Sequence, residues 1–360
     1  MEDRVSKTVN ILAFFLGLGL LVGLVFYHGV DRTADEMAQV GWRIIWPCLC
    51  AYAMMFCGSI CWYLYMEPGS FKGNIMHLYL ANLSGQAMNQ LTPTAGLGGE
   101  AIKGTLLAGR AKSEVLAASL IQYNVCYTAW SAVLVIAGPI VLMFDVLPNV
   151  TWEQRLLLFG VGLLCFSPVI GLLWLIKRGA VSSLFGLIRK LRLPIKTEKL
   201  NNWAQRVDHD LRDFKNRYPK RHFWAQIVMI LNRIFSVFEV WAILLIMPEG
   251  LLTVEPTLAL ALVIMSVSQI IAWVFAAIPA QMGILEGMQG GLFKYLGIGT
   301  VATGVGMEFV RRARKLILNI FGLLCMVVLQ RMPGPTADTD QEDSSADEGE
   351  SAGESDAVES

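Results

Sequence analysis

The sequence predicts an all-α polytopic membrane protein, and three observations support this fold class. Hydrophobic residues make up 55% and charged residues 16% of the 360 residues, and the mean hydropathy is +0.53. Several apolar runs reach the roughly 20 residues that a helix needs to cross about 30 Å of hydrocarbon. Basic residues gather between these runs, as expected for alternating membrane crossings. We therefore expect about 7–8 transmembrane helices.

The apolar runs, in chain order, define the expected spans. Long runs cover 9–30, 42–65, 115–144, 156–176, 222–247 and 256–278, and a shorter run covers 316–330. The first run follows Arg4 and Lys7, but it is long and has no small-residue cleavage site before Asp31. We interpret it as a membrane anchor rather than a removed signal peptide.

The distribution of Lys and Arg predicts the orientation of these spans. The connection 177–221 holds 13 basic and four acidic residues, and 103–112 is also basic. Short cytoplasmic loops are enriched in such residues, so both belong in the cytoplasm, together with the N-terminus. The acid-leaning connections near 31–36, 145–153 and 249–255 then lie outside.

The cytoplasmic connection is also a candidate for binding to membrane lipids. Within 184–193, apolar residues alternate with basic ones, a composition that attracts anionic lipid headgroups at the membrane surface. The other interpretation is that these charges only enforce the topology, and the sequence leaves both open.

The charge distribution divides the chain into a basic membrane part and an acidic tail. Residues 332–360 hold ten acidic residues and no Lys or Arg, so 1–331 carry 29 basic against 19 acidic residues. The tail has almost no apolar residues to bury and is predicted to be disordered. We expect a membrane domain over 1–331 and a disordered acidic tail over 332–360.

Cysteine and histidine patterns exclude several functions. All seven cysteines fall inside apolar runs and the four histidines are scattered, so neither set has the spacing of a metal site. No phosphate-binding loop is present. We therefore predict no metal, no cofactor, no nucleic-acid partner and no soluble enzyme.

Two stretches, 89–103 and 278–287, do not look like ordinary spans. In each, a glutamate follows a proline by seven residues, with glycines between them: Pro93 with Glu100, and Pro279 with Glu286. Proline and glycine interrupt a helix, and a broken backbone inside a membrane survives only where protein or a wet cavity surrounds it. The matched spacing predicts two broken or re-entrant segments in an internal repeat, the pattern that marks transporter binding sites.

These segments supply the candidate binding site. The new helix N-termini favour an anionic group such as a phosphate, whereas the simpler interpretation is that the glutamates cap their own helices. Lys103, three residues after Glu100, has the spacing for an ion pair with it. The candidate substrate-binding residues are Asn89, Pro93, Gly98, Gly99, Glu100, Lys103, Gln122, Asn124, Pro279, Gly283, Glu286, Gly287, Arg311 and Arg312.

At these residues the chain resembles a known family. The pattern Pro-Thr-x-x-x-Gly-Gly-Glu-x-x-Lys at 93–103, and Pro-x-x-x-Gly-x-x-Glu-Gly at 279–287 with the Arg-rich 311–314, is similar to the lysylphosphatidylglycerol synthase transmembrane region, or flippase-like, family. The resemblance covers roughly 8–331 and is closest to the hopanoid-biosynthesis-associated branch. Lys103 stands where many relatives carry arginine, so a bidentate grip on phosphate would be lost while the charge remains.

The resemblance implies a multipass protein of the bacterial inner membrane that flips or handles an amphipathic lipid: a hopanoid, a phospholipid or a polyprenyl-linked lipid. The alternative is a non-catalytic membrane scaffold or accessory subunit for a lipid- or glycan-modifying enzyme. An enzymatic function of its own is not expected, because two carboxylates without an accompanying His, metal or activated Ser are a thin basis for catalysis.

Overall fold

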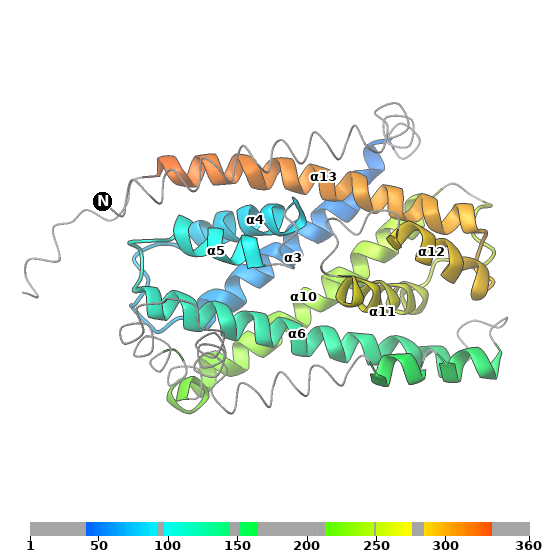
Figure 1. Ribbon diagram of the computed structural model, residues 1–360, viewed down its shortest axis with the longest axis horizontal. Helices are drawn as coiled ribbons and strands as arrows, with labels where there is room; N and C mark the ends of the chain where they lie inside the picture. The colour runs from blue at the N-terminus through cyan, green and yellow to red at the C-terminus, as the bar shows by residue number, and fades with distance from the viewer. Residues whose placement is uncertain are drawn as a thin grey trace, which may run out of the picture.

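The computed structural model describes residues 41–91, 97–144, 151–157, 159–164, 207, 213–247, 250–275 and 284–332. Throughout these ranges the regular elements are helices (Figure 1). The fold class is therefore all-α, and four of the described helices are long and apolar enough to cross a membrane.

The first group of helices covers the chain from Gly41 to Met143. A 3-10 turn, η1 (Gly41–Ile44), leads into α3 (Ile45–Leu64). Then follow α4 (Ile75–Leu91), the short α5 (Leu97–Leu106) and the long α6 (Ser113–Met143). The α5 helix has only ten residues, about 15 Å at 1.5 Å per residue, which is half of the hydrocarbon thickness.

The second group has the same order of lengths. The long α10 (Pro219–Ile246) precedes α11 (Leu258–Val274), the short α12 (Ile284–Tyr295) and the long α13 (Val301–Arg331). Helices α4 and α11 both have 17 residues, α5 and α12 have 10 and 12, and α6 and α13 both have 31.

Local chemistry explains several of the helix boundaries. The hydroxyl groups and backbone N–H groups of Thr300 and Thr303 form a reciprocal capping box at the start of α13, and the Thr257 side chain accepts a hydrogen bond from Leu260 at the start of α11. The turns before α6 and α13 each contain a glycine with positive φ, Gly109 at 80° and Gly297 at 66°. Glycine reaches this conformation without steric cost.

Three of the predicted spans are confirmed by described helices, and a fourth differs at the C-terminal end. The runs 42–65, 115–144 and 222–247 correspond to η1 with α3, to α6 and to α10. The short run 316–330 is only the last part of α13, so that prediction was wrong about where the helix begins. The basic residues 311–315 interrupt the apolar run but not the helix, because their charges are paired inside the bundle.

Other predictions fall outside the described residues. These are the run 9–30, most of 156–176, most of the basic connection 177–221 and the tail 332–360. Of the sites within the two interrupted segments, Pro93, Pro279 and Gly283 also lie outside.

The two groups of helices pack across each other. Helices α3 and α10 pack side by side along a diagonal through the centre of the bundle, with α4 and α5 to one side and α11 and α12 to the other (Figure 1). Helix α13 packs along α4, and α6 packs along α11. Helix α5 packs mainly against α4, which precedes it, and α12 packs mainly against the long α13. Glu100 and Glu286 therefore lie against neighbouring helices within the bundle.

Small residues allow these contacts to be close. A Cβ on Gly304 of α13 would lie 2.5 Å from the Gln289 carbonyl oxygen and 2.8 Å from the Gly290 Cα of α12. Helix packing at such a distance requires a residue without a side chain. Two residues further along α13, a Cβ on Gly306 would meet nothing within 4 Å.

We predict that Gly304→Ala lowers the thermal stability of the purified protein, because the contacted atoms are backbone and cannot move aside cheaply. A loss of about 1–3 kcal/mol is expected for overpacking of this kind. The control is Gly306→Ala, for which the alanine enters open space and favours the helix. Melting curves in detergent measure both variants, and equal melting temperatures would contradict the proposed α12–α13 contact.

Candidate functional site

The Glu100 carboxylate, near the start of α5, joins three helices. One of its oxygens accepts a hydrogen bond from Lys103 Nζ at 2.9 Å and one from the Asn89 amide of α4 at 3.4 Å. The other accepts a hydrogen bond from the Asn124 amide of α6 at 3.1 Å. Asn89 also accepts a hydrogen bond from the Gly99 backbone N–H at 2.6 Å, which satisfies one of the free donors at the N-terminus of α5.

Lys103 is buried by unusually close packing. Its stem passes over Gly85 of α4, where a Cβ would lie 2.6 Å from two of its carbons. Its ammonium group lies 5.5 Å from the centre of the Tyr123 ring and 5.9 Å from that of Trp62. The side chain of Lys103 is 3% exposed, while that of Glu100 is 23% exposed. The pair is thus buried at the cation and accessible at the carboxylate.

A polar layer continues from this pair into the bundle. Next to Gly58 of α3 lie the Tyr123 hydroxyl and the amide groups of Asn82 and Asn232. Beside Asn232, the buried Arg233 donates to Ser131 at 3.0 Å and to the Asn232 amide oxygen, and its guanidinium stacks 4.0 Å from the Tyr127 ring centre. Arg233 is therefore held by neutral groups and an aromatic face, with no carboxylate within ion-pair distance among the described residues.

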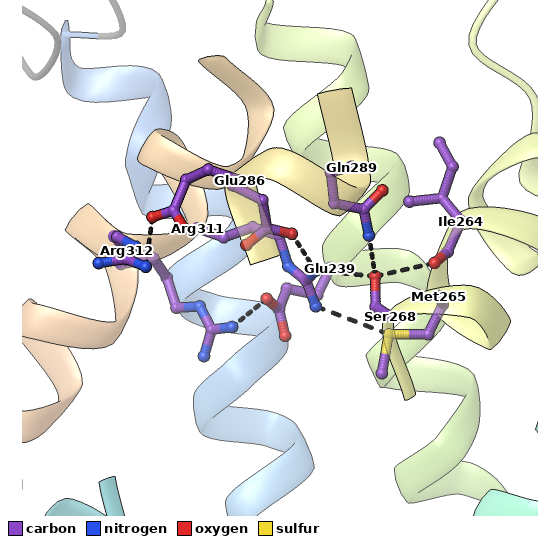
Figure 2. Close-up of polar contacts among 10 residues, drawn as sticks. Glu239, Ile264, Met265, Ser268, Glu286, Gln289, Arg311 and Arg312 are labelled. Carbon is purple, nitrogen blue, oxygen red and sulfur yellow. Dashed lines mark hydrogen bonds and ion pairs between the residues drawn. The ribbon is translucent and has the colours of Figure 1, made fainter. Parts of the chain in front are cut away.

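The second group of charges lies on α13 and its neighbours. Arg312 pairs with Glu286 of α12, and Arg314 pairs with Glu239 of α10 (Figure 2). Arg311 pairs with Glu308 one turn earlier on the same helix, at 2.6 Å. All six side chains are buried. Paired charges of this kind survive burial, whereas a single unpaired one would be costly.

Ser268 of α11 connects this group to the remaining helices. Its hydroxyl accepts hydrogen bonds from Gln289 at 2.6 Å and from Arg311 at 3.0 Å, and it donates to the Ile264 carbonyl at 2.8 Å (Figure 2). Helices α11, α12 and α13 thus share one hydroxyl group. The polar cluster of the second half comprises Glu239, Ser268, Glu286, Gln289, Glu308, Arg311, Arg312, Arg314 and Lys315.

The cluster is not fully hydrogen-bonded. Its six buried charges balance, three carboxylates against three guanidinium groups, and the half-buried Lys315 adds one positive charge on the same helix. Within the cluster, the buried atoms Gln289 Oε1, Glu308 Oε2, Arg311 Nε and Arg314 Nε find no hydrogen-bond partner among the described residues. Most buried polar atoms are hydrogen-bonded, so such a group needs an explanation.

The structure groups most of the predicted site residues into these two centres. Asn89, Gly99, Glu100, Lys103 and Asn124 come together, and so do Glu286 and Arg312. Arg311 contacts Glu308 and Ser268 in the same cluster.

The remaining predicted residues have other surroundings. Gln122, two residues before Asn124, lines a small crevice beside Asp213 and Arg217, so it faces another part of the bundle. A Cβ on Gly287 would meet nothing within 4 Å. Gly98 lies beside the first centre, on the first turn of α5.

The candidate set left out Glu239, Ser268, Gln289 and Glu308. Ser268 and Glu308 contact the predicted Arg311, whereas Glu239 pairs with Arg314 and Gln289 donates to Ser268. The spacing of Glu308 and Arg311, three apart on one helix, was a usable signal. The partner of Glu239 was not recoverable from spacing, because Arg314 is 75 residues away. Within the described ranges, no group of His, Cys, Asp and Glu side chains is arranged to hold a metal ion.

We predict that Arg314→Met destabilises the protein by about 3–5 kcal/mol, because it leaves the Glu239 carboxylate buried without its partner. The double variant Glu239→Gln with Arg314→Met removes both charges and should recover much of that loss. Melting temperatures of the single and double variants test this coupling, and strictly additive effects would contradict it. Arg217→Met, which breaks the exposed pair with Glu67, is the control, with an expected cost of about 1 kcal/mol or less.

The comparisons with known proteins agree with this architecture. The family model described as the lysylphosphatidylglycerol synthase TM region matches residues 11–322. Neither a curated protein nor a solved structure gives a significant match to the chain. The match covers both polar centres and the described helices up to residue 322 within α13, and the resemblance seen in the two glutamate motifs is confirmed. The chain therefore belongs to the lysylphosphatidylglycerol synthase TM region family of membrane proteins.

Proposed function

We propose that this protein binds an amphipathic lipid through its polar headgroup and moves the lipid across the membrane. The observation that carries the proposal is the buried polar cluster around α13, where charged side chains and unpaired donors and acceptors lie inside an apolar bundle. Ionisable residues within membrane helices are rare and mark substrate paths. A lipid-related role also fits the family to which the chain belongs.

The helix arrangement supports an internal repeat, with α3 to α6 as one unit and α10 to α13 as the other. In Figure 1, α6 runs from left to right and α13 from right to left, so the two units have inverted directions. Transporters built from inverted repeats place their binding sites where discontinuous helices of the two units meet the bundle interior.

Equivalent contacts in the two units support the same interpretation. Glu100 contacts Asn124, the twelfth residue of α6, and Glu286 contacts Arg312, the twelfth residue of α13. Ser84 of α4 donates to the Gly322 carbonyl of α13, and Ser266 of α11 donates to the Val135 carbonyl of α6.

The two units differ in how their short helix packs. Helix α5 packs mainly against α4, which precedes it, whereas α12 packs mainly against α13, which follows it. In inverted-repeat transporters, alternating access comes from rocking or gating of one repeat against the other. The unequal packing supports two exchangeable arrangements of the short helices, one of which is observed here in each unit.

The remaining attributes of the proposal come from the sequence. The lipid is a hopanoid, a phospholipid or a polyprenyl-linked lipid, and the protein acts in the bacterial inner membrane with a cytoplasmic N-terminus and no catalytic activity of its own. The basic connection 177–221 would bind anionic headgroups at the cytoplasmic surface.

We predict that Glu286→Gln and Glu100→Gln each slow lipid movement in proteoliposomes by about tenfold or more, as expected when one charge-assisted hydrogen bond is lost. Translocation of labelled lipids, with and without a pH gradient, measures this. Glu67→Gln is the control, because Glu67 forms an exposed ion pair with Arg217. Its variant should transport like the wild type.

Correct folding of each variant is checked by gel filtration and melting temperature. Wild-type movement that persists in both folded glutamine variants would contradict the proposed site. No lipid movement by the wild type would instead favour the scaffold function, which predicts tolerance at these glutamates and sensitivity in the connection 177–221.

A further inference from the structure

A large groove lies between the first turns of α3 and the second half of α10, and none of its lining residues belongs to either glutamate centre. Its volume is about 750 Å³, within the range of about 300–1,000 Å³ that ligand pockets have. We call it the α3–α10 groove. It is lined by Trp42, Arg43, Trp46, Leu49, Cys50, Ala53, Phe235, Phe238, Trp241, Ala242, Leu245 and Ile246.

The lining is chemically complementary to an amphipathic ligand. Arg43 is its one charged residue, and the other eleven are apolar or aromatic, including three tryptophans. Trp42 and Trp46 remain 74% and 53% exposed. Tryptophan favours the boundary between hydrocarbon and headgroups, and an arginine there offers a guanidinium to a phosphate. The groove thus has an apolar body with one cationic anchor.

The groove lies beside the buried charges of the bundle. Glu239 follows the groove residue Phe238 on α10 and is itself buried. The α10 wall of the groove is therefore adjacent in the chain to the residue that pairs with Arg314.

We propose that the α3–α10 groove binds one anionic phospholipid, with its acyl chains along the tryptophans and its phosphate on Arg43. The proposal concerns binding and does not require that the lipid is transported. Charge complementarity at Arg43 selects an anionic headgroup over a zwitterionic one, and the volume suits acyl chains.

The test uses the full chain in nanodiscs that contain a photoactivatable phosphatidylglycerol with a diazirine in one acyl chain. After irradiation, mass spectrometry locates the labelled peptides. We expect labels within 42–53 and 235–246. Ala53→Trp fills the groove and should reduce this labelling to background. Leu324→Trp, at an exposed apolar position of α13, is the matched control and should leave it unchanged.

A second variant tests the headgroup. Arg43→Gln should lower the ratio of phosphatidylglycerol to phosphatidylcholine labelling in the groove about fivefold, since one basic residue contributes roughly that preference. An unchanged ratio would overturn the role of Arg43. Undiminished labelling in folded Ala53→Trp would overturn the groove as the site. Crosslinks from the groove to residues 1–40 or to a second copy, in place of lipid, would name the protein itself as the occupant. These readouts are independent of lipid transport, so the two proposals fail separately.

Discussion

The pairing of buried charges on α13 is the constraint on which this fold depends. Five ionisable residues lie between 308 and 315 on a helix that packs inside an apolar bundle. An isolated charge there would be too costly, so partners must come from other elements. Glu286 links α12 to α13, Glu239 links α10 to α13, and Ser268 links α11 to α13. The charges that make α13 look like a poor membrane helix therefore fix the position of three neighbours.

Close backbone contact is the second condition, because these pairs form only when the helices approach each other. Gly304 brings α13 against α12, and Gly322 brings it against α4, where a Cβ would lie 2.6 Å from the Leu83 carbonyl oxygen. Dispersion contacts and hydrogen bonds, rather than a hydrophobic force, hold helices together in lipid. Gly85 has the same role for Lys103. The small residues allow the helices to approach closely enough for the ion pairs and hydrogen bonds of the two polar centres to form.

The sequence predicted what depends on local composition. Apolar length located α3, α6 and α10, and the proline-to-glutamate spacing located the start of α5 and of α12. The sequence analysis missed the first half of α13, because its charged residues look like the end of an apolar span until their ion-pair partners are known. It also placed Gln122 with Asn124, although residues two apart on a helix face different neighbours. The Glu239–Arg314 pair depends on tertiary packing across 75 residues, which spacing does not encode.

The two glutamates differ in what holds them, and this difference suggests which unit moves more easily. Glu286 is buried and paired with Arg312, so separating them would leave two charges unpaired in a region of low dielectric. Glu100 is partly exposed, carries its own cation on the same helix and contacts α6 through the neutral Asn124. Displacing α5 from α6 therefore breaks the hydrogen bond to the neutral Asn124 and the contact of Lys103 with the Tyr123 ring, and it keeps the Glu100–Lys103 pair intact. We infer that α5 is the more mobile of the two short helices, and that α12 moves only when another anion replaces Glu286 at Arg312.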